Sequence, residues 1–469
     1  MDNRNPQGAA RPGHSRQAVR SEAADLDRRH LWHPFTQMLE WEKEDFPVIV
    51  RGEGVYLIDE AGTRYLDGVS SLWCNVHGHG QARIVEAISK QAAELDHSTL
   101  LGLAHPVAAR LAERLIAAAP RGLTRVFYSD NGATAVEIAL KIAFQYQLQR
   151  TPPRPEKRKF MALTEAYHGD TLGAMSVGGI DLFHETYRPL LFETHYAEAP
   201  YCYRCPFGKT YPECSVYCAG EMEGAIRRHA AELAAFIVEP VMQGAGGMIA
   251  APEGFLRRIR KVCDECDVLL IADEVATGFG RTGRMWACDH EEVSPDLMAL
   301  AKGLTGGTLP LAATLTTERI YDAFLGDYGS KRTFYHGHTY TGNPIACAAA
   351  LASLEIFEEE RTLERLPGKI ALLSEELERF KALPHVGDVR QRGLMVGIEL
   401  VLDEETKEPY PFERRIGHRV TLEARRRGLI TRPLGNVVVL MPPLSTPDDL
   451  LREMARITYE SIRAAREGS

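Results

Sequence analysis

The sequence predicts an α/β protein: a large domain with a mostly parallel central sheet, and a smaller α+β domain built from both chain ends. Short apolar runs alternate with helical patterns through the middle of the chain, which is typical of parallel strands connected by helices. The last part instead combines two strand-like runs with one long amphipathic segment. A chain of 469 residues is long enough for two or three domains.

Six apolar runs predict the strands of the central sheet. Each is short and bounded by glycine, proline or acidic residues, as in strands that are buried on both faces. After the first run, residues 133–146 have helical spacing, with Asp130 or Asn131 before them as a cap. Ligands of such sheets bind at the carboxyl ends of the strands. The runs are residues 125–129, 159–166, 234–240, 268–274, 296–303 and 312–317.

The smaller domain is predicted from both ends of the chain. Residues 54–68 have the pattern of a hairpin with a turn near residues 60–62. Near the other end, residues 393–401 and 436–443 look like strands, and residues 446–467 form an amphipathic helical pattern. The predicted parts are a disordered arm (1–28), a first small-domain segment (29–75), a large domain (76–350, with a cysteine-rich insertion at 200–220) and a second small-domain segment (351–469).

Composition narrows the class of protein. The net charge is −9, from 55 basic and 64 acidic side chains, which argues against nucleic acid or an anionic membrane as the main partner. There is no apolar run of 18 residues, so no membrane span is expected. The first 20 residues are polar and lack the apolar stretch of a secretory signal. A cytoplasmic protein is expected.

Nine cysteines are spread along the chain, and a reduced, cytosolic protein is the default for such a pattern. Four of them form the pattern C-x2-C-x8-C-x3-C, which is close to the spacing of a zinc ribbon. A surface insertion with free thiols, a structural metal site and disulfides all remain open. Catalysis is not expected there, because four thiolates leave no open position on a metal. The four are Cys202, Cys205, Cys214 and Cys218.

Lys302 and Asp273 are the most informative pair. Each ends an apolar run, where a buried charge is costly unless it is paired. A lysine there suits a covalent bond to an aldehyde cofactor. An acid at a neighbouring strand end suits the ring nitrogen of pyridoxal phosphate (PLP), which must stay protonated. Taken alone, Asp273 could be a helix cap and Lys302 a solvated lysine; the pair, followed by several glycines, favours the cofactor.

Two further segments fit a PLP site. Gly132 follows a strand and begins a helix, where backbone amides can bind a phosphate. Tyr167 follows another strand and could stack on a flat ring. Taken alone, the first could be an ordinary turn and the second a core aromatic residue.

With these motifs in place, the chain resembles the class III aminotransferases of the PLP fold-type I family from about residue 30 to the C-terminus. The signature of this family is similar to the stretch of this chain that runs from LLIADEVATGFGRTG to DLMALAKGLTGGTLPLAA. Within the family, it is most similar to the branch that makes 7,8-diaminononanoate for biotin. The segments that carry this likeness are HLWHPFTQM, DGVSSLWCNVHGH, SDNGATAVEIALKIAFQY, YHGDTLGAMSVGG, EPVMQGAGGM, HGHTYTGNPIACAAA and TRPLGNVVVLMPP.

The resemblance implies a role for each motif residue. Lys302 would hold the cofactor and transfer a proton, Asp273 would hold the pyridinium proton, and Tyr167 would stack on the ring. Gly132 and Ala133 would bind the phosphate, and Thr339 would reach it from the partner of a homodimer with a shared active site. The expected substrate-pocket residues are Phe35, Trp73, Asp170, Gly337 and Arg432, with Arg432 binding a distal carboxylate.

The resemblance also implies the substrates. The acceptor would be 8-amino-7-oxononanoate and the donor S-adenosylmethionine. Phe35 stands where better-known adenosylmethionine-using members have tyrosine, and Leu72-Trp73 where they have a tryptophan pair. Lysine is therefore a second candidate donor. Three further functions remain open: an ω-amino acid–pyruvate aminotransferase, a PLP decarboxylase or racemase, and a non-enzymatic PLP- or zinc-binding protein.

Overall fold

The computed structural model describes residues 21–467, and the chain divides into two compact units. The smaller unit comprises residues 1–51 and 58–63, and the larger one residues 52–57 and 64–469. Strands β1 (Ile49–Glu53) and β2 (Tyr56–Asp59) run across the boundary between these ranges. The boundaries predicted at residues 75 and 350 remain a prediction.

The smaller unit begins with two helices, α1 (Glu22–His30) and α2 (Met38–Trp41). The Trp41 indole donates to Asp27 at 2.8 Å, and the Arg28 guanidinium lies over the Phe46 ring. The disordered arm predicted over residues 1–28 is therefore wrong for its last part, because Ser21 caps α1 and acidic and basic residues match the helix dipole at its two ends. Residues 1–20 lie outside the described residues.

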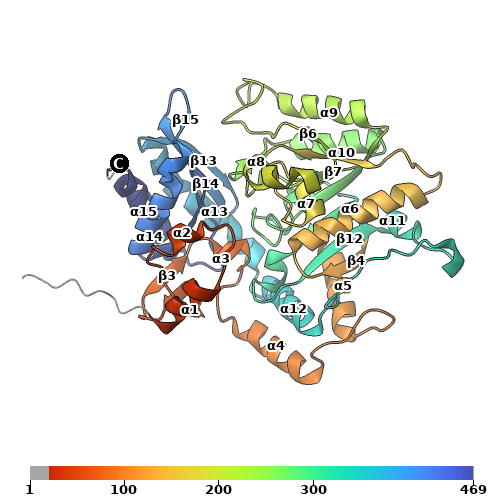
Figure 1. Ribbon diagram of the computed structural model, residues 1–469, viewed down its shortest axis with the longest axis horizontal. Coiled ribbons are helices and arrows are strands. Elements are labelled where there is room, and N and C mark those ends of the chain that lie inside the picture. The colour runs from red at the N-terminus through yellow and green to blue at the C-terminus, as the bar shows by residue number, and fades with distance from the viewer. Residues whose placement is uncertain (1–20, 468–469) are drawn as a thin grey trace, which may run out of the picture. The chain divides into compact units, whose positions relative to one another are not determined.

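The larger unit is built on a seven-stranded sheet in the order β4-β12-β11-β10-β7-β5-β6 (Figure 1). Strand β12 is antiparallel to both of its neighbours, while β11-β10-β7-β5-β6 are parallel to one another. The strands are β4 (Leu123–Ser129), β5 (Lys159–Leu163), β6 (Thr194–Ala197), β7 (Leu233–Val238), β10 (Leu269–Asp273), β11 (Leu297–Leu300) and β12 (Ala312–Thr317).

All six predicted runs form strands of this sheet, so the α/β expectation is confirmed. Strand β6, which has four residues and lies at the edge of the sheet, was not predicted. The reversed direction of β12 was not predicted either, because an apolar run has the same pattern in either direction.

Side chains of the central strands alternate between two hydrophobic layers. In β7, Ile237 packs in the layer of helix α6 and Phe236 in the layer of α9 and α10; in β10, Ile271 and Leu270 do the same. Continuous apolar runs thus fill both faces. Figure 1 shows α6 and α9–α10 on opposite sides of these strands. These helices are α6 (Gly132–Gln149), α9 (Tyr217–His229) and α10 (Phe255–Glu265).

Helix α6 begins at the carboxyl end of β4. The Asn131 side chain accepts from the Thr134 amide, and Thr134 in turn bonds to the Asn131 amide, which completes a capping box. The predicted helix and one of its two predicted caps are confirmed. Other helices of this part are α4 (Ala82–Glu94), α5 (Pro106–Ala118), α7 (Leu172–Ser176), α8 (Asp181–His184), α11 (Glu318–Asp322) and α12 (Pro344–Glu359).

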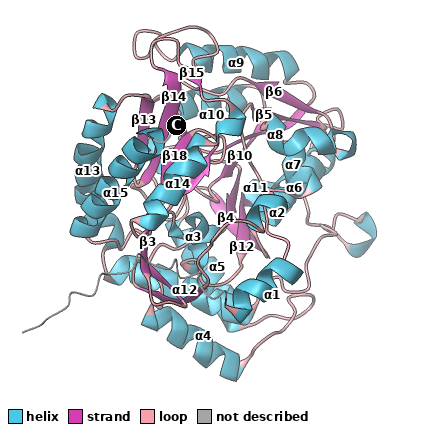
Figure 2. Cartoon of the chain, turned by 60° about the vertical axis from the view of Figure 1, so that its left-hand side comes forward, coloured by secondary structure: helices cyan, strands magenta, loops and turns pink. Residues whose placement is uncertain are grey.

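A second sheet forms from the C-terminal part, in the order β13-β14-β18-β17 with β15 beside β14. In addition, β16 (Leu429–Ile430) pairs in parallel with β3 (Arg64–Asp67), so early and late segments share a sheet as predicted. Figure 2 shows α13, α14 and α15 beside these strands. The elements are β13 (Val386–Arg392), β14 (Met395–Asp403), β15 (Glu408–Pro409), β17 (Arg432–Leu434), β18 (Val437–Leu440), α13 (Thr362–Glu378), α14 (Ile416–Arg426) and α15 (Asp448–Glu467).

Between residues 21 and 467, the structure contains no helix with the length and apolar character that crossing a membrane requires.

Candidate active site

A cavity of about 800 Å³ lies at the carboxyl ends of the central strands. The segments after β4, β5, β10 and β11 form its wall, together with residues 72–74 and 307–311. This is the edge at which α/β sheets bind their ligands. Seven of the predicted residues meet here: Gly132, Ala133, Tyr167, Asp170, Asp273, Lys302 and Trp73.

Lys302 follows the end of β11 after one residue, Ala301, and its side chain lines this cavity. Its backbone has a φ of 44°, a left-handed conformation that is unfavourable for lysine and turns the chain sharply at the strand end. Burial lowers the pKa of Lys302, although the negative charges of Asp273 and Glu239 oppose this effect. A larger fraction of neutral amine makes Lys302 a better nucleophile and base.

Asp273 ends β10 and is buried, and a histidine holds it in place. Its Oδ2 lies 2.7 Å from His168 Nδ1, and its Oδ1 accepts from the Val275 amide at 3.0 Å. His168 Nε2 has no hydrogen-bond partner between residues 21 and 467. No role was predicted for His168, because only the fold brings it to a residue 105 positions away.

Glu239 is a second buried acid of this cavity, and it was not among the predicted site residues. It accepts from the Tyr167 amide at 3.1 Å and from the Gly244 amide at 2.8 Å. Burial raises the pKa of Glu239 to about 7. Its position after an apolar strand, like that of Asp273, was the signal that could have found it.

The first turn of α6 offers an anion site to this cavity. The amides of Gly132 and Ala133 at the helix start have no intrahelical acceptor, and the positive end of the helix dipole favours a phosphate. Gly132 is required because a Cβ there would lie 2.6 Å from Val275 Cγ1. The cavity therefore combines an anion site, a buried acid and a lysine, and these residues fit PLP.

Tyr167 and Asp170 form another part of the wall. The Tyr167 hydroxyl donates to Asp170 Oδ2 at 2.8 Å. Burial raises the pKa of Tyr167, and the hydrogen bond to Asp170 adds to this effect. The phenol thus stays neutral at physiological pH, which keeps the ring available for packing against a flat ligand.

A strained loop places Trp73 beside the lysine. Ser70, Ser71 and Trp73 all have φ between 52° and 63°, and Asp67 fixes the loop by accepting from the Ser71 amide at 2.8 Å. The Lys302 ammonium lies 4.9 Å from the centre of the Trp73 ring. Strain of this kind persists where the surrounding structure enforces it, and it is common at functional sites.

Three predicted residues of the larger unit do not line this cavity. Thr339 and Gly337 are exposed on the segment before α12, where neighbouring His338 lies 2.8 Å from Asp130 at the cavity rim. Arg432 begins β17 and is half-buried, and this burial lowers the pKa of its guanidinium. The fourth, Phe35, is exposed in the smaller unit, and its place in the substrate pocket stays a prediction.

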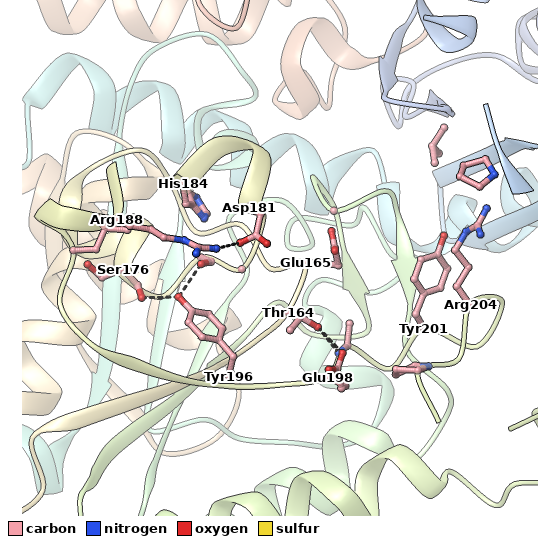
Figure 3. A pocket seen from close by; sticks show the side chains of 18 of the residues that line it. Thr164, Glu165, Ser176, Asp181, His184, Arg188, Tyr196, Glu198, Tyr201 and Arg204 are labelled. Atoms are coloured by element: carbon pink, nitrogen blue, oxygen red, sulfur yellow. Dashed lines mark hydrogen bonds and ion pairs between the residues drawn. The ribbon is translucent and has the colours of Figure 1, made fainter. Parts of the chain in front are cut away.

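A larger cavity of about 1060 Å³ lies elsewhere in this unit (Figure 3). Four of its charged groups have partners: Asp181 pairs with Arg188 at 2.6 Å, and Arg204 donates to Glu399 at 2.6 Å. Lys302 and Asp273 are not part of its wall. The smaller cavity is therefore the candidate active site.

The model of the family "Aminotransferase class-III" matches residues 38–462. A curated relative from Geobacter sulfurreducens, adenosylmethionine-8-amino-7-oxononanoate aminotransferase, is 58% identical over 422 residues, which are 90% of this chain and 93% of the relative.

Solved structures agree with this match. The enzyme of the same name from Methanocaldococcus jannaschii has a TM-score of 0.90 and 48% identity, over 94% of this chain and 98% of that one. An amine transaminase from an uncultivated Pseudomonas species, solved in its PLP-bound form, has a TM-score of 0.86 and 40% identity. The match covers 93% of this chain and 98% of that one. The chain belongs to the class III aminotransferases, a family of PLP-dependent enzymes with the fold-type I architecture.

Proposed function

We propose that the chain is the transaminase of biotin biosynthesis that converts 8-amino-7-oxononanoate into 7,8-diaminononanoate. The observation that carries the proposal is the 58% identity, over 90% of the chain, to a relative named for this substrate. The cavity that joins Lys302 with Asp273 supplies the chemistry of an aminotransferase. We take S-adenosylmethionine, which also appears in the names of the curated relatives, as the amino donor.

PLP, when bound, carries the amino group between the two substrates and accepts the electron pair released at the donor carbon. Lys302 anchors it, and the Lys302 Nζ then removes the proton from the donor Cα, a step that its lowered pKa favours. Asp273 would keep the ring nitrogen protonated, and His168 orients the Asp273 carboxylate through its 2.7 Å contact. Tyr167 would cover the ring, and the amides of Gly132 and Ala133 would hold the phosphate.

Substrate recognition is assigned to a second group of residues. Arg432 binds the distal carboxylate of the keto acid, because its planar guanidinium makes two parallel hydrogen bonds to a carboxylate. Its partly buried position strengthens such a pair by excluding water. The other proposed contacts are Trp73, Asp170, Gly337 and Phe35.

The donor is tested by one comparison. Leu72 lines the cavity with an aliphatic side chain, which cannot attract a sulfonium by a cation–π contact, and this observation keeps lysine as the second candidate donor. Purified enzyme is given 8-amino-7-oxononanoate with either compound, and 7,8-diaminononanoate is measured by mass spectrometry. Formation of 7,8-diaminononanoate with S-adenosylmethionine supports the proposal. If it forms with lysine but not with S-adenosylmethionine, lysine is the donor instead.

A different substrate would overturn the reaction itself. If the enzyme ignores 8-amino-7-oxononanoate but transfers amino groups from ω-amino acids to pyruvate, it is an ω-amino acid–pyruvate aminotransferase. If the cofactor never reaches the pyridoxamine form with any donor, the enzyme is not a transaminase.

We also propose a homodimer in which Thr339 binds the cofactor phosphate of the partner subunit. Thr339 is exposed and lies outside the cavity wall of its own chain, as this arrangement requires. Mixing Lys302→Ala chains with Thr339→Ala chains tests it, because only a site shared between subunits yields one intact site per mixed dimer. Activity above that of either variant supports the proposal, and no gain in a mixed dimer of measured mass contradicts it.

The proposed setting is the cytoplasm, with small molecules as the partners of the active site. All nine cysteines are free thiols, which suits a reducing compartment. Localisation of a tagged chain by cell fractionation checks this proposal.

A further inference from the structure

The segment from the end of β6 to the first turn of α9 holds four of the nine cysteines, and the function proposed above uses none of them. Cys202, Cys205, Cys214 and Cys218 line one small cavity of about 10 Å³. All four are free, partly buried thiols. We propose that these four side chains bind one zinc ion in a structural site, and we call residues 199–218 the cysteine loop.

The spacing and the backbone of the cysteine loop suit four thiolate ligands. After Cys205, the chain turns back at Gly208, whose φ is 63° and whose amide donates to the Cys205 carbonyl at 3.0 Å. Cys218 lies in the first turn of α9, where the helix dipole favours a thiolate. Two pairs of cysteines that enclose one point are the usual ligand set of structural zinc.

The sulfurs are too far apart in this structure to share one ion, and side-chain rotation is the movement that we propose brings them together. Zinc binds sulfur at about 2.3 Å, and turning a cysteine from one staggered rotamer to another moves its sulfur by about 3 Å. Between residues 21 and 467, only His195, His229 and Glu232 already have their ligand atoms within 4.8 Å of one another. The four sulfurs therefore move inward when the ion binds.

Zinc with four thiolates has a net charge of −2, and one positive side chain at the cavity would offset part of it. Lys209 is part of the wall. Rings complete the wall; they come from Tyr201, Tyr211, Tyr217, Pro200, Pro206 and Pro252.

The cysteine loop has a clear need for such an anchor. Residues 199–216 form no helix or strand, yet the loop holds a buried acid of the second sheet. Tyr201 and Arg204 both donate to Glu399 of β14, Arg204 at 2.6 Å, and Figure 3 shows these two side chains together at one end of the larger cavity. Zinc would fix the loop in the position that this contact requires.

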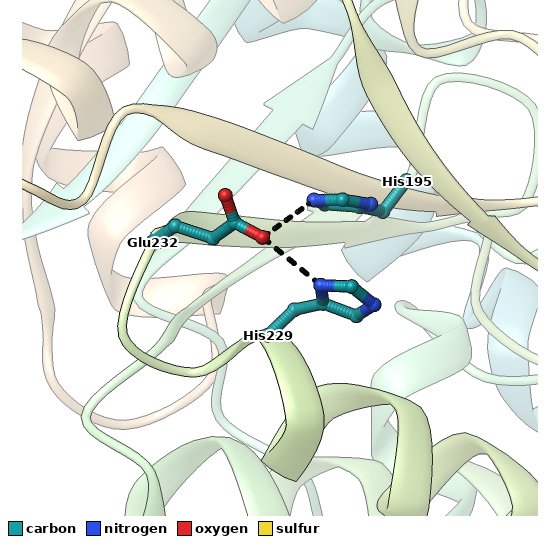
Figure 4. Close-up of side chains that lie close together, drawn as sticks. All are labelled: His195, His229 and Glu232. Carbon is teal, nitrogen blue, oxygen red and sulfur yellow. Dashed lines mark hydrogen bonds and ion pairs between the residues drawn. The ribbon is translucent and has the colours of Figure 1, made fainter.

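The histidine cluster at His195, His229 and Glu232 is the competing metal site. Both histidines contact the same Glu232 oxygen, at 3.0 and 2.9 Å, and Lys159 lies 3.3 Å from the other oxygen (Figure 4). Each group of the cluster thus has a partner of complementary charge, and an ammonium beside the carboxylate disfavours a second cation. We therefore use this cluster as a control.

The first test counts metal ions in holoenzyme that is purified without an affinity tag. Inductively coupled plasma mass spectrometry is expected to find one zinc per chain in the wild type and in the controls Cys266→Ser and His229→Ala. The variant Cys202→Ser/Cys214→Ser should lose it. A wild type that retains no zinc after incubation with zinc and gel filtration overturns the proposal, as does a double variant that keeps its zinc.

The second test needs no variant, so a folding defect cannot obscure it. Iodoacetamide labelling with peptide mapping should find the four cysteines protected until a chelator is added, while Cys266 reacts in both states. Trypsin should then cleave after Arg204 or Lys209 in the chelated protein only. Equal labelling and cleavage before and after chelation, or a disulfide among the four, overturns the proposal. Transamination is measured in parallel, so the two proposals fail separately.

Discussion

In the central sheet, the edge formed by the carboxyl ends of the parallel strands and the edge formed by their amino ends both carry a lysine and a glutamate. The pKa values of these side chains are shifted in opposite directions at the two edges. At the carboxyl edge, Lys302 and Glu239 line the active-site cavity. At the amino edge, Lys159 begins β5 and Glu232 precedes β7. Burial lowers the pKa of Lys302, whereas hydrogen bonds to Glu193 and Glu232 raise the pKa of Lys159.

The two glutamates differ in the same way. Burial raises the pKa of Glu239 to about 7. The hydrogen bond from His229, with Lys159 in support, lowers the pKa of Glu232 to about 2. At the amino edge the charges satisfy one another in water, which leaves little reactivity (Figure 4). At the carboxyl edge, desolvation disfavours the charged forms of both Lys302 and Glu239, and shifts of this kind are typical of catalytic sites.

The largest effect is expected from the two lysines. Lys302→Ala should lower turnover by roughly 10³-fold or more, because the general base is lost, and the absorbance of covalently bound PLP should disappear. Lys159→Ala should leave turnover within about twofold, because an exposed ion pair contributes little. Full turnover in Lys302→Ala would remove the basis of the comparison. Steady-state kinetics and absorbance spectra check both variants.

The two acids should differ next. Asp273→Asn should lower turnover by roughly 10²–10³-fold, because removing one partner of a buried ion pair costs about 3–5 kcal/mol. The amide cannot keep the ring nitrogen protonated. Glu232→Gln is the matched control at the other edge and should be near wild type. Similar losses in both variants would mean that Asp273 acts only on folding, which circular dichroism of each variant would reveal.

The pH dependence of stability sharpens the contrast further. With a folded pKa near 7 against about 4.3 when unfolded, Glu239 holds its proton more tightly in the folded protein. It therefore costs stability as pH rises from about 4.3 to 7, by up to about 1.4 kcal/mol per pH unit, and the cost is constant above that range. Relative to wild type, Glu239→Gln should gain stability between pH 5 and 7.

Urea unfolding at several pH values measures this gain. A difference between Glu239→Gln and wild type that does not change with pH would show that Glu239 is ionised in the folded protein. Replacing Glu232 by glutamine should give no such gain over the same pH range, because its folded pKa is lowered and not raised.

The smallest effect is expected at the amino edge. His229→Ala removes one partner of Glu232. The His229 side chain is 34% exposed and the Glu232 side chain is 37% exposed. We expect the free energy of unfolding to change by at most about 1 kcal/mol, as for other exposed pairs, and less at high salt. A loss of several kcal/mol in urea unfolding would show that this cluster is not a simple surface network.

Local sequence was sufficient for much of the fold. Apolar runs bounded by glycine and acidic residues marked six of the seven strands, and Asn131 marked the start of α6, because periodicity and capping act over a few residues. It was also sufficient for the pair Lys302 and Asp273, since a charged group that ends an apolar strand is costly without a partner. The short edge strand β6 has too few residues to show a period.

Tertiary structure alone decided the rest. His168 reaches Asp273 from another strand end, β12 runs against its neighbours, and four cysteines close around one cavity. Most of all, the sequence places Glu232 before strand β7 and Glu239 after it, but it does not show that their pKa values shift in opposite directions. Desolvation depends on everything that packs around a side chain, and that sum exists only in the folded chain.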